Sequence, residues 1–346
     1  MRAFMVKLVL PVALLAFASA ARAGGVDRIG TAGAQELRIP VGAAQLGIAG
    51  SSVALGAGLS NLYWNPASLA STDNSEALAS YSTYLADSKV NYGAASLRVG
   101  ASGALAVSLK VLNIGDITVT TEDAPAGTGE ILNPNFAVVG ISYGRRMTDR
   151  VLIGVTGNYV NEKVAQTSAS GIALDLGVQY DTGWRGLRFG FAMKNVGPNM
   201  QFSGSGLEQR LVLPGDDPSA QPHVVQLQST DFELPTYMQL GLAYDVKVAE
   251  NQSVTVTGAF QSNNFSNDEY RLGGEYILGR HLALRAGYQN QVHISDPSQA
   301  QYLYGVSYGA GLNFKLGETP MSFDWAGPSV GEFFQDNQQF SLNIAF

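Results

Sequence analysis

The histidines are the residues best suited to acid–base or nucleophilic chemistry, and the chain has three of them, His223, His281 and His293. Hydrolysis by a serine nucleophile needs a histidine held beside the serine. No motif in the sequence indicates such a pair, so we predict that the protein is not an enzyme. We interpret the three histidines as solvated turn and loop residues.

A cluster of carboxylates could bind a divalent cation, and it comprises Asp216, Asp217, Asp231 and Glu233. The spacing of these residues does not match a calcium loop of the D-x-D-x-D-G kind. Gly-Ala-Gly occurs at 56–58 and at 309–311, without the spacing of a dinucleotide-binding loop. We therefore predict no metal site and no cofactor, and we interpret the acidic cluster as a solvated loop.

A second group of charged residues lies in segments where apolar and polar residues alternate. In residues 187–194, Leu187 and Phe189 fall on one face of an extended chain. Arg188 and Lys194 fall on the other face. Unpaired charges are costly in an enclosed space, so residues of both signs should form ion pairs across it, unlike the single-sign lining of an ion channel. The candidates for this enclosed polar lining are Asp175, Arg188, Lys194, Asp245, Arg271, Glu275 and Arg285.

The composition limits the kinds of fold that could carry these charged residues. Only 14% of the 346 residues are charged, whereas ordinary soluble domains have about 25%. There are 40 glycines and no cysteine, so no disulfide framework can stabilise the fold. The length suits either two or three soluble domains or one large barrel. The low charge indicates a protein that either buries more of its residues than usual or faces something other than water.

Residues 1–23 have the plan of a secretory signal peptide. Arg2 and Lys7 precede an apolar run that ends in Ala21-Arg22-Ala23, which predicts cleavage after Ala23. The run is short for an uncleaved membrane anchor, and no later run of 18 or more apolar residues predicts a spanning helix. Cleavage removes three of the 21 basic residues and leaves 18 against 28 acidic ones, a net charge of −10. This balance argues against nucleic acid as a partner.

Fourteen segments of alternating polarity follow residue 75, and an even number is typical of bacterial single-chain barrels. Tight turns alternate with longer polar links, of which the longest are 115–135, 196–235, 290–301 and 327–337; two others, near Asp87 and Thr167, are only modestly longer than the tight turns. A soluble sandwich would not alternate its links in this way. The sequence therefore predicts an all-β fold, a transmembrane antiparallel β-barrel over residues 76–346 with short periplasmic turns and long extracellular loops. The predicted strand cores start near Leu78, Tyr92, Leu105, Phe136, Leu152, Ile172, Leu187, Tyr237, Val254, Tyr270, Leu282, Tyr304, Met321 and Phe340.

The final residues, QFSLNIAF, place Phe340, Leu342, Ile344 and Phe346 on one face. This segment resembles the closing strand of bacterial outer-membrane barrels, in which a terminal phenylalanine is part of the assembly signal. We therefore predict that Phe346 has this role, and that the barrel-assembly machinery and outer-membrane lipid are partners. The predicted location is the outer membrane of a Gram-negative bacterium.

Residues 24–75 differ from the rest, because they are rich in Gly and Ala and nearly free of charge after Arg38. A barrel of about 14 strands encloses more space than its own side chains fill. We expect these residues to form a hatch inside the barrel, since a flexible linker would be polar. Its proposed hinge is the motif formed by Tyr63, Trp64, Asn65, Pro66 and Ala67.

The stretch IPVGAAQLGIAGSSVA followed by YWNPASLA resembles the hatch of the FadL superfamily of outer-membrane barrels, whose Asn-Pro-Ala motif corresponds to Asn65, Pro66 and Ala67. Residues 189–202, 234–246, 271–289 and 322–346 resemble the PorV/PorQ branch of that superfamily. The resemblance spans essentially the whole mature chain. It implies a 14-stranded barrel with a plugged lumen and a place in type IX secretion, where such proteins bind C-terminal signal domains of cargo and carry them to a surface attachment complex.

Two functions remain open at this point. The first is a non-enzymatic adaptor or component for protein secretion and surface attachment, whose loops 196–235 and 115–135 meet secreted cargo or secretion-system subunits. The second is a FadL-like channel for uptake or export of hydrophobic small molecules. A contiguous apolar cavity from the loops to the hatch would favour the channel, whereas an exposed loop surface would favour the adaptor.

Overall fold

The computed structural model describes residues 28–100, 102–212, 221–292, 303–331 and 336–346. The expected signal peptide, residues 1–23, lies outside the described residues, as do His293, Asp216 and Asp217.

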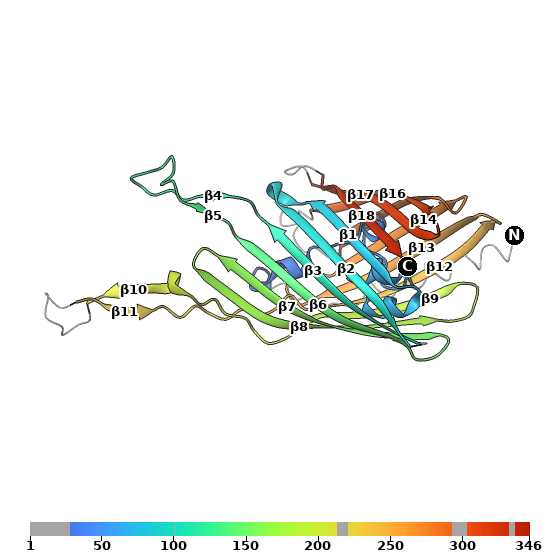
Figure 1. Ribbon diagram of the computed structural model, residues 1–346, viewed down its shortest axis with the longest axis horizontal. Helices are drawn as coiled ribbons and strands as arrows, with labels where there is room; N and C mark the ends of the chain where they lie inside the picture. Colours follow the sequence, from blue (N-terminus) through green and yellow to red (C-terminus); the bar gives the residue numbers. More distant parts are fainter. Residues whose placement is uncertain (1–27, 101, 213–220, 293–302, 332–335) are drawn as a thin grey trace.

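Fourteen strands of the described chain form one closed antiparallel barrel, in which β1 pairs with β18 (Figure 1). Each predicted strand core starts inside one of these strands, so the predicted all-β barrel of about 14 strands is confirmed. The strands are β1 (Glu76–Thr83), β2 (Lys89–Val99), β3 (Gly103–Asn113), β6 (Asn135–Arg146), β7 (Val151–Val164), β8 (Thr167–Asp181), β9 (Leu187–Val196), β12 (Tyr237–Ala249), β13 (Gln252–Asn263), β14 (Glu269–Leu278), β15 (Leu282–Gln291), β16 (Tyr304–Leu316), β17 (Thr319–Val330) and β18 (Gln339–Ala345).

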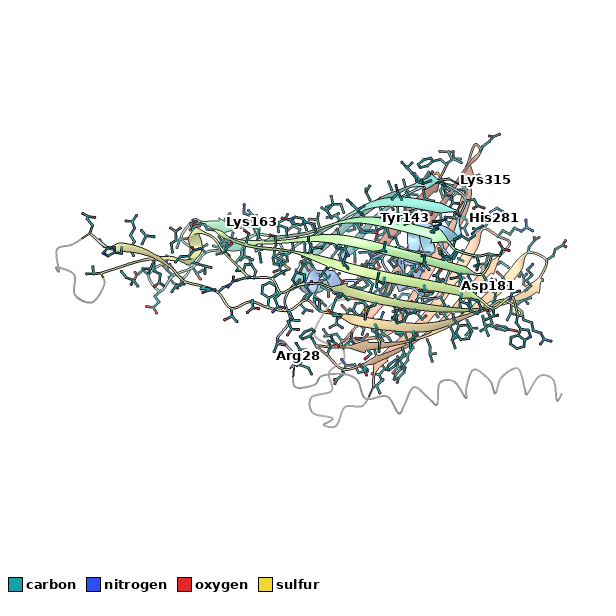
Figure 2. All side chains as sticks on the ribbon, turned by 90° about the horizontal axis from the view of Figure 1, so that it is seen from below. Arg28, Tyr143, Lys163, Asp181, His281 and Lys315 are labelled. Atoms are coloured by element: carbon teal, nitrogen blue, oxygen red, sulfur yellow. The ribbon has the colours of Figure 1, made fainter. Side chains whose placement is uncertain are left out.

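The two rims of the barrel differ in the length of their links. At one rim short turns join the strands, and His281 and Lys315 lie at this rim (Figure 2). At the other rim two links carry hairpins that project beyond the barrel, as Figure 1 shows at the left. These are β4 (Ile117–Thr118) with β5 (Ile131–Leu132), and β10 (Glu208–Leu211) with β11 (His223–Gln226). Outer-membrane barrels have short periplasmic turns and long extracellular loops, so the hairpin rim is the outer one.

One expectation about the links was wrong. The link near Thr167 is not longer than the tight turns, because β7 and β8 pair as far as Val164 and Thr167 and only residues 165–166 join them. The alternating pattern continues through both arms of this hairpin, and the extra residues lengthen the strands instead of the link.

Side chains alternate between the outer face and the lumen, as the sequence pattern predicts. In β8, Ile172 is 57% exposed and Leu174 48%, whereas Asp175 and Gln179 are buried. Exposed aliphatic side chains recur around the outer face, and Ile141 in β6 is 65% exposed. An apolar surface of this extent suits a lipid bilayer and not water. Of the helices in the described part of the chain, none has both the length and the apolar character to span a bilayer.

The lumen is filled by residues 28–75, which we refer to as the N-terminal segment. This segment contains the short helices η2 (Gln35–Arg38), α2 (Ala43–Leu46), η3 (Gly58–Asn61) and η4 (Pro66–Ser71), and β1 begins directly after it. Helix η4 contacts β6, β7 and β8, while α2 contacts β16 and β17. Val41, Leu59 and Leu69 of the segment form a buried apolar cluster with Val90 and Ala104 of the wall. The apolar core therefore lies between the segment and the wall.

Candidate functional site

The motif of residues 63–67 lies at the start of η4, and Asn65 fixes it from several sides. The Asn65 side chain is fully buried. Its Nδ2 donates to the carbonyl oxygens of Val53 (2.7 Å) and Val178 (3.2 Å), and its Oδ1 accepts from the backbone N–H of Ala67 (3.0 Å). Asn65 therefore caps the helix and binds the wall at the same time. Pro66 occupies the first helical position, where its missing N–H is no loss.

The two aromatic residues of the motif tie the N-terminal segment to itself. The Tyr63 hydroxyl donates to the carbonyl oxygen of Leu37, and Trp64 Nε1 donates to that of Val41, each at 3.0 Å. The rings meet edge to face with centroids 5.2 Å apart. These contacts connect η4 to the start of the segment, so the whole segment behaves as one packed unit.

Two buried lysines of the wall hold this unit in place. Lys194 Nζ donates to the carbonyl oxygen of Tyr63 at 2.7 Å and pairs with Asp175 at 2.6 Å. Lys110 Nζ donates to the carbonyl oxygens of Leu37 (3.3 Å) and Ile39 (3.2 Å). The two ammonium groups also lie 5.0 and 4.6 Å from the centre of the Tyr63 ring, within cation–π range. Sequence reasoning missed Lys110, although it is the one charged residue of β3.

The remaining candidate residues of the lining pair with neighbours along the wall. Arg188 meets Asp245 at 2.6 Å on the adjacent strand. Arg285 meets Glu275 on the adjacent strand, also at 2.6 Å. These two pairs thus run between adjacent strands and not across the lumen as expected, because the N-terminal segment occupies the centre. Arg285 also pairs with Asp324 of β17 at 2.6 Å, and Arg271 pairs with Glu269 of its own strand at 2.7 Å.

Above the N-terminal segment, toward the outer rim, lies a cavity of about 820 Å³. Aromatic side chains and several charged ones line it, including Glu36 and Arg38 of η2 and Glu162 of β7. Burial, and then the neighbouring carboxyl of Glu162, raise the pKa of Glu36 to about 8, so this side chain holds its proton at neutral pH. The floor of the cavity is the N-terminal segment itself.

The histidines and the members of the acidic cluster that the structure describes do not converge on a site. His281 is exposed at the short-turn rim and His223 is exposed on β11. Asp231 accepts a hydrogen bond from Asn199 at 2.6 Å, and Glu233 pairs with Arg28. Within the described ranges, no group of three His, Cys, Asp or Glu side chains is placed to hold a metal ion.

The β10–β11 hairpin is attached firmly at its base and exposed beyond it. At the base Met200 bridges to Phe232, and the rings of Phe202 and Phe232 lie 5.6 Å apart. Farther out, Val224 is 59% exposed and Leu227 47%. In the described part of the chain this sheet consists of these two strands alone, so no third strand borders the outer edge of either.

The closed barrel, the apolar outer face and the occupied lumen together define a β-barrel of the outer-membrane class. Solved structures similar to it include the Pseudomonas putida toluene transporter TodX, with a TM-score of 0.55, 15% identity and coverage of 88% of this chain and 96% of that one. A Pseudomonas aeruginosa FadL homologue has a TM-score of 0.51 and 13% identity, with coverage of 89% of this chain and 98% of that one. The CymD monoaromatic hydrocarbon channel has a TM-score of 0.52 and 13% identity, with coverage of 89% of this chain and 97% of that one. At such identities the likeness concerns the fold alone.

The family model described as "Type IX secretion system protein PorV" matches residues 25–215, which is more than half of the chain. The chain therefore belongs to the PorV family of type IX secretion system proteins, a family of non-enzymatic outer-membrane barrels. The expected resemblance to this family is confirmed, and so is the expected FadL-like barrel. Comparison with curated proteins found no match.

Proposed function

We propose that the protein is an adaptor that binds an exported protein or another secretion-system subunit at the cell surface through the β10–β11 hairpin. The family supports an association with type IX secretion, and the exposed hairpin supports the mode of binding. In this proposal, residues 1–23 direct export, residues 24–75 serve as the hatch and Phe346 contributes to recognition by the barrel-assembly machinery.

The exposed apolar side chains of the hairpin are the observation that carries the proposal. An isolated two-stranded hairpin is only marginally stable in water, and its free edges can accept another strand. Val224 and Leu227 extend into solvent on such a hairpin, together with Leu211 on β10. A partner that adds a strand to this sheet would cover the apolar side chains and form backbone hydrogen bonds along its edge.

Affinity purification from native membranes tests this proposal. An epitope tag in the short turn at 279–281 leaves the hairpins and Phe346 unchanged. We expect the wild-type protein to capture secretion subunits or exported proteins, and a variant lacking residues 205–227 to lose them while its barrel still assembles. Deletion of 118–130, in the other hairpin, is the matched control for loss of an extracellular loop. Equal capture by the variant lacking 205–227 would show that the recognition surface lies elsewhere.

The outer cavity supports a second candidate function, the passage of hydrophobic small molecules. Its volume of about 820 Å³ lies within the range of ligand sites, and Phe136, Phe202 and Phe232 are among its lining residues. Transport would require the N-terminal segment to move. Co-purified lipid or fatty acid, with capture of secretion subunits absent, would favour this function over the adaptor.

A further inference from the structure

The lipid-facing surface of the barrel has a groove along β1 and β2. Outward-facing residues of adjacent strands form rows, and one row places Ala79 opposite Gly93. The next row toward the hairpin rim places Tyr81 opposite Asn91. These four residues line a depression of about 450 Å³, which we refer to as the β1–β2 groove. Its floor at Ala79 and Gly93 is backbone and one methyl group, and it lies on the face that meets the bilayer.

Larger apolar side chains form the two walls of the β1–β2 groove. On one side Leu342 of β18 lies beside Ala79, and Phe323 of β17 lies beside Leu342. The Phe323 ring stacks on that of Phe340 with centroids 6.3 Å apart, which stiffens this wall. On the other side Leu109 of β3 lies beside Gly93. The groove is two strands wide, about 10 Å, with ridges on both sides.

Past Tyr81 and Asn91, the wall just beyond the outer end of the groove is polar and basic. Across β1, β2 and β3, one outward-facing row at the hairpin rim consists of Thr83, Lys89 and Asn113. Lys89 is exposed, and in the described part of the chain no carboxylate lies within ion-pair distance of its Nζ. Four residues of strand, about 13 Å, separate Lys89 from Gly93. The cation therefore lies at head-group level when the groove floor lies among the acyl chains.

We propose that the β1–β2 groove binds one molecule of the phosphorylated glycolipid of the outer leaflet, a lipid A. An acyl chain lies over Ala79 and Gly93, and a phosphate pairs with Lys89. The ligand must be an amphiphile, because the floor at Ala79 and Gly93 is apolar and the wall just beyond the outer end of the groove is cationic. It must come from the outer leaflet, because the cation stands at the hairpin rim. Lysine pairs well with phosphate as a point charge. This site goes beyond the proposed adaptor function and does not depend on it.

Gly93 allows the groove to be filled without disturbing the wall. A β-carbon at Gly93 would meet no atom within 4 Å, so Gly93→Leu places its side chain in the groove. Gly274 in β14 is a matched control, because it also has open space and its neighbour Val256 faces outward at 53% exposure. For the charge, Lys89→Gln is compared with Lys315→Gln at the opposite rim (Figure 2).

The measurement is native mass spectrometry of the full-length protein, purified in detergent, delipidated and titrated with diphosphoryl lipid A, dephosphorylated lipid A or phosphatidylglycerol. We expect one diphosphoryl lipid A per barrel, at least tenfold weaker binding in Gly93→Leu, and wild-type binding in Gly274→Leu. Lys89→Gln should lose the preference for the phosphorylated form, whereas Lys315→Gln should keep it. Unchanged binding in Gly93→Leu overturns the proposal. Equal binding of phosphatidylglycerol, or a dimer that Gly93→Leu abolishes, also overturns it.

Discussion

Gly154 in β7 lies against Pro66 of the N-terminal segment so closely that a β-carbon on the glycine would stand 2.2 Å from the proline carbonyl carbon. Gly177 in β8 has the same relationship to Asn65, with 2.0 Å to its Oδ1. A glycine inside a strand often marks a place where another backbone approaches closely. The wall therefore has a recess, made by two glycines, that receives the Asn65–Pro66 peptide.

Gly154→Ala is expected to push η4 out of this recess, because the nearest atoms belong to backbone and cannot rotate away. Overpacking of this kind costs about 1–3 kcal/mol. Uptake of a dye that the outer membrane normally excludes should rise. The control is Gly157→Ala on the same strand, where a β-carbon would be 3.9 Å from the Leu174 side chain. Equal uptake by the two variants would show that the recess does not keep the lumen closed.

Lys194→Met is expected to destabilise the barrel by about 3–5 kcal/mol, because it leaves Asp175 charged and buried without its cation. The side chains of this pair are only 3% and 4% exposed. The Arg188–Asp245 pair is more exposed, at 22% and 41%, so Arg188→Met should cost about 1 kcal/mol or less. Urea unfolding in detergent, followed by the gel shift between folded and unfolded barrel, measures both. Similar losses in the two variants would contradict the predicted difference between buried and exposed pairs.

The docking of η2 is expected to weaken as the pH rises. The pKa of Glu36 is about 8 in the folded protein and 4.5 ordinarily. The folded state therefore holds the proton longer, and its stabilisation is full below pH 4.5, declines between 4.5 and 8, and is absent above 8. Lys110 opposes the shift and Glu162 enhances it. The hydrogen-exchange protection factors of residues 35–39, which correct for the intrinsic rise of the exchange rate with pH, should fall over this range in the wild type and stay constant in Glu36→Gln. The same fall in Glu36→Gln would assign the effect to another group.

Phe346→Ala is expected to lower the amount of assembled barrel with little effect on its stability once folded. The Phe346 side chain is 66% exposed, so its removal exposes little buried surface. Its backbone exchanges two hydrogen bonds with Ser75, at 3.1 and 2.9 Å, and alanine keeps both. Pulse-labelled assembly in cells and the unfolding midpoint of the purified protein separate the two effects. A lower midpoint with normal assembly would refute the role in assembly.

The strands could be predicted because each one faces lipid on one side and the lumen on the other. Ile172 and Asp175 show this, since a period of two assigns each residue to a face without knowledge of its neighbours. The family resemblance came from separate motifs, such as Asn65-Pro66-Ala67, and not from this alternation. The link near Thr167 was misjudged because polar residues such as Asn161 and Ser168 continue a strand as readily as they form a loop.

The contacts inside the lumen could not be predicted, because the period of two says which residues face inward but not what they meet. Lys110 was visible as an inward lysine, yet its partners are carbonyl oxygens of a segment some seventy residues earlier in the chain. The sideways ion pairs, such as Arg285 with Glu275, depend on strand register and on a filled centre. Inward-facing glycines such as Gly154 were the one sign of the recess in the sequence. A glycine adds no side chain to the packing of a strand, so its presence there indicates that another backbone comes close.

The N-terminal segment leads directly into β1, the strand that meets β18 when the cylinder closes. The contents of the lumen are thus synthesised before the wall that surrounds them. The segment does not have to be threaded through a finished ring, because a curling sheet can wrap around it and the last pairing encloses it. Removal afterwards would require an exit through a rim, or a reopening of the one junction made between the two ends of the sheet.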